Sequence, residues 1–183
     1  MLEMAAAKRW GMDQYDRLDP LTVSLGHPDA LIAMLSGKSE VTAHFCVAPF
    51  QWYEIDAGMR PILKTYDMLG GPHTNGIQVT TEAFHSANPT ICRAVFEAHN
   101  EANAFINSDP HGAADIYRTL SGDRRGSIEE LVKMIADPDI VYTTTPANIA
   151  TMVRFMADTG RLKTVPSSWK DMFLPEAQDL PGT

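Results

Sequence analysis

The chain has 183 residues and a formal net charge of −8 at pH 7, with 44% hydrophobic and 21% charged residues. This balance is typical of a folded α/β or helix-rich protein that is long enough to bury a core. The acidic excess disfavours binding to nucleic acid or to an anionic membrane surface, because a phosphate backbone requires basic side chains. No apolar run approaches the roughly 20 residues that a membrane-spanning helix needs.

Residues 1–16 predict a short helix, since Leu2, Ala6 and Trp10 share one helical face and Gly11 follows the last of them. A secretory signal would have a basic start and an apolar core of about 7–15 residues. This segment has neither, and it carries Glu3. The sequence therefore predicts no signal peptide here, which implies a cytoplasmic product if the chain is complete.

Residues 27–51 predict a helix, then a strand, then a loop. Pro28 suits the first turn of a helix and Gly37 suits the residue just after its end. From Glu40 to Cys46, apolar residues alternate with others in the rhythm of a strand. Ligands of open α/β sheets bind beyond the carboxyl ends of parallel strands, so we expect the ligand site at residues 46–51.

Two further strands are predicted at residues 62–65 and 77–82, and a short one at 140–145. Pro89, Pro110 and the capping-box pair Ser127 and Glu130 predict the starts of three helices. Another helix is predicted from about residue 149 to Gly160, and a single turn around Trp169 before an extended tail. We expect a three-layer α/β lobe with a mostly parallel sheet over residues 1–82, followed by a helical portion and tail over 83–183.

Four stretches carry a family resemblance: DALIAMLSGKSEVTAHFCVAPFQ (29–51), ILKTYDMLGGPHTNGIQVTTEAF (62–84), the helical residues 88–120, and SSWKDMFLPEAQDLPG (167–182). They resemble the second half of a substrate-binding protein of the nitrate/sulfonate/taurine class of ABC importers. That superfamily also includes thiamine-pyrimidine synthesis proteins. Members have two lobes, and this chain resembles one that begins inside the first helix of the second lobe.

The resemblance implies a periplasmic-binding-protein type II-like lobe and a periplasmic location. It implies a protein that captures a small organic or anionic solute in an interlobe cleft and delivers it to an ABC permease, with no catalysis, metal or cofactor. An enzyme of thiamine-pyrimidine precursor metabolism, or a cytoplasmic sensor derived from half of a receptor, is the alternative. The tail of such a protein packs back across the hinge onto the first lobe.

By this resemblance, eight residues from three loops are expected to bind the solute: Ser24, His27, Cys46, Pro49, Phe50, Gln51, Thr74 and Asn75. Each loop also has a structural interpretation. His27 could cap its helix, the aromatic residues after Pro49 could fill a core, and GGPHTNG could be a plain turn. Neither the 46–51 loop nor GGPHTNG contains Arg or Lys, so nitrate, sulfonates, pyrimidines and aromatic carboxylates all remain open.

A metal site and a nucleophilic site are both disfavoured by spacing. His44 and Cys46 share one strand face, and His73 could be a third ligand, but no Cys-x-x-Cys or His-Glu-x-x-His spacing is present. A nucleophilic Cys46 paired with a histidine would need an orienting carboxylate, and the sequence shows none. Cys46 and Cys92 are expected to be unpaired thiols.

The expected partners are a solute, a permease and a second copy of the chain, with no nucleic acid. If the first lobe is absent, the apolar tail from Ser167 to Leu180 and the edge of the predicted sheet are both uncovered. Exposed strand edges and apolar tails pair between identical chains. A homodimer formed through the tail or the sheet edge is therefore expected.

Overall fold

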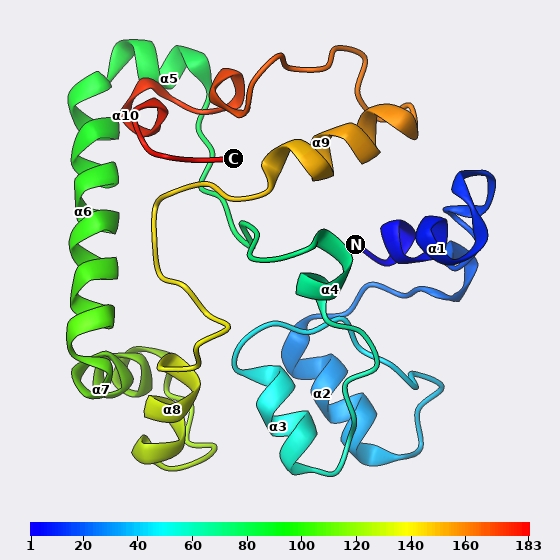
Figure 1. Cartoon of the computed structure of the whole chain (residues 1–183). Helices are drawn as coiled ribbons and strands as arrows, with labels where there is room; N and C mark the ends of the chain where they lie inside the picture. The colour runs from blue at the N-terminus through cyan, green and yellow to red at the C-terminus, as the bar shows by residue number, and fades with distance from the viewer. The chain divides into compact units, whose positions relative to one another are not determined.

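The computed structural model describes residues 1–183 as two compact units, Met1–Met68 and Leu69–Thr183. Helices make up 55% of the chain, and the structure has no β-strand. The predicted three-layer α/β lobe with a mostly parallel sheet is therefore wrong. Each unit is a set of helices joined by extended segments (Figure 1).

The segments predicted as strands have mostly no regular secondary structure, and none of them pairs in a sheet. Residues 40–46, 77–81 and 140–145 form no ladder, and Thr65 and Glu82 instead begin helices. Alternating β-branched residues indicate a preference for a half-buried sheet surface, yet a strand is stable only when a neighbour pairs with its backbone. The nearest approach to pairing is at Thr74, whose N–H donates to the Ala147 carbonyl over 2.9 Å.

The first unit contains α1 (Leu2–Trp10), α2 (His27–Ser36), α3 (Phe50–Asp56) and most of α4 (Thr65–Leu69), with 3-10 turns at 12–14 and 19–21. Helices α2 and α3 lie side by side (Figure 1). Helix α1 ends at Gly11 and α2 ends at Gly37, as the sequence predicts. Gly37 adopts a left-handed conformation with φ of 61°, which favours glycine.

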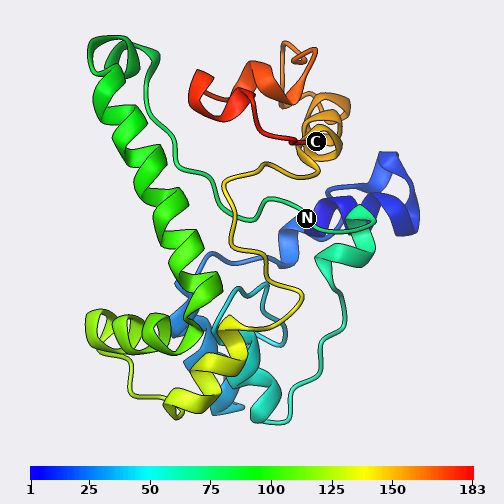
Figure 2. The same ribbon diagram turned by 60° about the vertical axis from the view of Figure 1, so that its left-hand side comes forward.

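The second unit contains α5 (Glu82–Ala87), α6 (Pro89–Ser108), α7 (Pro110–Ser121), α8 (Ile128–Ile135), α9 (Ile149–Asp158), a 3-10 turn (Trp169–Met172) and α10 (Pro175–Gln178). Helix α6 has α5 at one end and α7 at the other (Figure 2). Helices α7 and α8 pack together, and they bury Ala113, Ala114, Leu131 and Met134. Helix α6 buries no residue.

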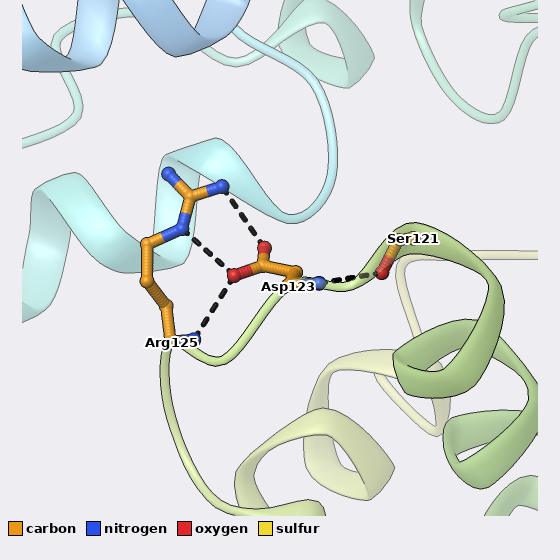
Figure 3. A network of polar contacts seen from close by, with 3 residues as sticks. All are labelled: Ser121, Asp123 and Arg125. Carbon is orange, nitrogen blue, oxygen red and sulfur yellow. Dashed lines mark hydrogen bonds and ion pairs between the residues drawn. The ribbon is translucent and has the colours of Figure 1, made fainter.

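The predicted helix starts of this unit are confirmed. Pro89 and Pro110 occupy first positions, and the Asp109 carboxylate accepts a hydrogen bond from the Gly112 N–H. Ser127 and Glu130 form the reciprocal capping box. Between α7 and α8, both guanidinium contacts of Arg125 to Asp123 are 2.9 Å long, and the Asp123 N–H donates to the Ser121 hydroxyl (Figure 3).

The tail beyond residue 166 is folded. Trp169 and Phe173 meet edge to face with their ring centroids 5.6 Å apart, and α10 follows where an extended tail is predicted. The N–H of Ile149 donates to the Thr183 carbonyl over 2.9 Å, which ties the tail to the start of α9. None of the helices combines the length and the apolar character that crossing a bilayer would require.

Candidate functional site

The side chains with the richest chemistry in the first unit meet where α2, α3 and the segment 37–49 come together. His44, Cys46 and Glu54 each place one potential ligand atom within 4.8 Å of the others. We call these three residues the His–Cys–Glu cluster. His27, the first residue of α2, and Phe50, the first residue of α3, lie beside it.

Local structure explains why these residues meet. His44 and Cys46 are two residues apart in the irregular segment that precedes α3, and their potential ligand atoms lie within 4.8 Å of each other. On α3, Phe50 and Glu54 are four residues apart and therefore lie on one face. The packing of α2 against α3 then brings His27 to the same place.

Two short contacts engage both ring nitrogens of His44. Its Nδ1 lies 2.7 Å from Glu54 Oε1, and its Nε2 lies 3.0 Å from Nδ1 of His27. The side chains of His44 and Glu54 are each only 9% exposed. An ionised carboxylate can only accept hydrogen bonds, so Nδ1 of His44 carries the proton in its contact with Glu54.

Cys46 is held as a neutral thiol. Burial, and after it the nearby charge of Glu54 and a hydrogen bond to its carboxylate, raise the pKa of the Cys46 thiol to about 11. The nucleophilic form of cysteine is the thiolate, which is scarce at neutral pH when the pKa is raised. Glu54 supplies the carboxylate that the sequence did not reveal, but its effect on Cys46 opposes nucleophilic catalysis.

Aromatic rings lie next to the cluster, and α3 also carries a buried polar atom without a partner. Phe50 stacks on His27 with ring centroids 5.5 Å apart and planes at 25°, and Tyr53 meets Phe50 edge to face at 6.4 Å. Gln51, one turn before Glu54 on α3, has a buried Oε1 atom with no hydrogen-bond partner. An unsatisfied buried acceptor costs about 1–3 kcal/mol, a cost that a donor on a bound ligand would remove.

Of the expected solute-binding residues, the structure brings His27, Cys46 and Phe50 to the cluster, and Gln51 follows Phe50 on α3. Pro49 follows a cis peptide bond and immediately precedes α3. Ser24 is exposed in the irregular segment before α2. The ring of His27 binds His44, and no side-chain hydrogen bond caps α2.

Thr74 and Asn75 belong to the second unit. The Thr74 hydroxyl accepts a hydrogen bond from the N–H of Ala147 over 2.9 Å, so this side chain holds the segments 70–81 and 138–148 together. Asn75 is exposed. His73 is also in this unit, and burial lowers its pKa.

The sequence interpretation missed Glu54, and it considered His44 only as a metal ligand. The signal for Glu54 was an acidic residue inside the aromatic run FQWYEI, where the other side chains predict burial. A carboxylate buried in such a run needs a hydrogen-bonding or charged partner. The partners of Glu54 are His44 and Cys46 in the segment before α3, and the sequence does not show that this segment packs on α3.

No protein family, curated protein or solved structure matches this chain.

Proposed function

We propose that this chain is the solute-binding component of an ABC importer and that its first unit contacts the solute. The observation that carries the binding role is Gln51 Oε1, a buried acceptor without a partner on α3, the helix that also carries the ring of Phe50. Binding sites for small molecules combine an apolar wall with a few polar groups that fix orientation. The importer role is supported by the resemblance of the four sequence stretches.

The groups present favour a flat solute that donates hydrogen bonds. The Phe50 ring, which stacks on His27, supplies an aromatic side of the site, and Gln51 Oε1 is an acceptor without a partner. Nitrate and the sulfonate group carry only acceptor oxygens, which would face this acceptor unfavourably, and the ammonium donor of taurine is not part of a flat ring. An aminopyrimidine suits the site better, because it combines a planar ring with an exocyclic N–H donor.

Calorimetry on the reduced, metal-free protein tests this function with three ligands: an aminopyrimidine, taurine and nitrate. We expect the aminopyrimidine to bind, and taurine and nitrate to bind at least tenfold more weakly. Gln51→Leu should weaken binding about tenfold, and Phe50→Ala should cost about 1–3 kcal/mol of binding free energy.

Phe45→Ala is the matched control, because Phe45 lies next to the cluster residues but is 48% exposed and should leave affinity unchanged. Equal effects of Phe45→Ala and Phe50→Ala would contradict the assignment of the site. If taurine or nitrate bound more tightly than the aminopyrimidine, the proposed chemistry of the solute would be wrong. Binding of none of the three would remove the support for a receptor of these solutes.

A further inference from the structure

The His–Cys–Glu cluster has the composition of a metal site. A thiol, an imidazole and a carboxylate are the three side-chain types that bind Zn²⁺, and all three are present with one ligand atom each within 4.8 Å of the others. Zinc bonds of about 2.0–2.3 Å at tetrahedral angles would separate such atoms by about 3.3–3.8 Å. Small side-chain rotations would therefore be enough to surround an ion.

We propose that His44, Cys46 and Glu54 form a binding site for a borderline-soft divalent metal ion, with Zn²⁺ as the ion that this donor set suits best. A thiolate selects against Mg²⁺ and Ca²⁺, which prefer oxygen ligands alone. Three protein ligands leave a fourth position of a tetrahedral ion open to water or another small ligand. The proposal does not depend on solute binding.

Charge balance favours a divalent ion at this place. The Glu54 side chain is 9% exposed, so its negative charge is largely removed from water. When the ion binds, the Cys46 thiol releases its proton to solvent, and the resulting thiolate and the Glu54 carboxylate together carry two negative charges, which one divalent cation neutralises. His44 adds a neutral ligand, so the completed group would have no net charge.

His27 is placed as the orienting partner of the ligand His44. If His44 binds the ion through Nδ1, its Nε2 carries the proton and donates to Nδ1 of His27, which lies 3.0 Å away. Metal-binding histidines commonly donate their other ring N–H in this way, which fixes the tautomer and the ring orientation. The stacking of Phe50 on the His27 ring holds that partner in place.

The sequence interpretation named His44 and Cys46 and considered His73 as the third ligand. The structure offers Glu54 in that role, eight positions after Cys46, on a separate helix. His73 belongs to the second unit and is not a member of the cluster. No spacing motif contains this set, because a loop and a helix start separate its members.

Cobalt titration of the reduced, metal-free full-length chain tests the site, because Co²⁺ substitutes for Zn²⁺ and is coloured. We expect one Co²⁺ per chain, a near-ultraviolet band from thiolate-to-cobalt charge transfer, and loss of the band when Zn²⁺ is added. Cys46→Ser should abolish the band. His44→Ala and Glu54→Gln should weaken binding at least tenfold, and His27→Ala about tenfold with the band retained.

Cys92→Ser is the matched control, because Cys92 is the other free cysteine and lies on α6 in the second unit. Its band should equal that of the unsubstituted chain. Zn²⁺ should also protect Cys46, but not Cys92, from alkylation followed by peptide mass spectrometry, a measurement that needs no substitution. Absence of the band, its loss in Cys92→Ser, or equal alkylation of Cys46 with and without Zn²⁺ would each overturn the proposal.

Discussion

His44 and Glu54 join the segment before α3 to α3 itself through a 2.7 Å contact between Nδ1 and Oε1. Both side chains are almost completely buried, and Glu54 also accepts a hydrogen bond from the Cys46 thiol. The carboxylate is thus the common acceptor for two groups that reach it from one stretch of irregular backbone. The shape of that stretch, and of any site built on it, depends on Glu54.

Glu54→Ala should therefore destabilise the first unit by about 1–3 kcal/mol, because it leaves the His44 and Cys46 donors buried without their acceptor. Urea unfolding followed by tryptophan fluorescence measures this, since Trp10 and Trp52 lie in the first unit. A Trp169→Phe background removes the signal of the second unit. Glu40→Ala, at an exposed position of the same unit, should change stability by less than about 0.5 kcal/mol. Equal effects of the two substitutions would contradict the buried role of Glu54.

Ser127→Ala should cost about 1 kcal/mol of the stability of α8, because it removes the acceptor of the Glu130 N–H and breaks the capping box. Hydrogen exchange of the α8 amides reports this loss locally. Ser86→Ala, an exposed serine within α5, is the matched control and should leave the exchange of α8 unchanged. Faster exchange of the α8 amides in Ser86→Ala, or unchanged exchange of these amides in Ser127→Ala, would show that the cap is not the cause.

Asn148 should be the most sensitive residue at the start of α9. Its φ is 59°, and its side-chain amide donates to the Leu69 carbonyl over 3.0 Å. Asn148→Ala should cost about 2 kcal/mol, from both the left-handed backbone and the lost hydrogen bond. Asn148→Gly should cost about half as much, since glycine accepts this backbone conformation. Urea unfolding monitored by circular dichroism measures the free energy of unfolding of both variants. If Asn148→Gly were no more stable than Asn148→Ala, the contribution of the left-handed backbone would be wrong.

Docking of α10 onto α5 should weaken in acid. Hydrogen bonding to its own backbone N–H at the start of α10, and a smaller contribution from His85, hold the pKa of Glu176 below its usual value of 4.5. A carboxyl group with a lowered pKa in the folded state contributes stability that is present above the unfolded value and is lost as pH falls through the folded value. Hydrogen exchange of the α10 amides at pH about 6 and about 3 should show this loss. In Glu176→Gln the pH dependence should disappear; if it persists, another group is responsible.

Self-association should occur through the extended segment before α5, not through the tail. Residues 75–80 form no backbone-to-backbone hydrogen bonds, and Ile77 and Val79 are 65% and 78% exposed. Unpaired extended backbone with apolar side chains adds strands from a second copy. Light scattering coupled to size exclusion should show dimers at micromolar concentration, and Ile77→Ser with Val79→Ser should favour monomers.

The matched control is Leu120→Ser, which removes an even more exposed side chain from the end of a helix, where the backbone is already paired. It should leave the dimer intact. A monomer at all concentrations, or a dimer equally sensitive to Leu120→Ser, would contradict pairing through this segment.

Local sequence signals predict where most of the longer helices begin and end. Pro89, Pro110 and the Ser127–Glu130 box act on backbone groups within a few residues of themselves, and so does Gly37 at the end of α2. Such signals satisfy or remove the unpaired N–H and C=O groups of a helix end, and they need no distant partner. The short helices α3, α4, α5 and α10 escaped prediction, because so few residues have little helical stability of their own and depend on packing.

Whether the alternating runs form strands, and which side chains meet, depends on how separate segments of the chain pack together. A strand needs a neighbour at hydrogen-bonding distance, and residues 40–46 and 77–81 have none, so their alternation produced no sheet. The His–Cys–Glu cluster likewise depends on a loop folding back onto α3, so that Glu54 meets His44. Contacts of this kind depend on which surfaces pack together, so they cannot be predicted from residue spacing along the chain.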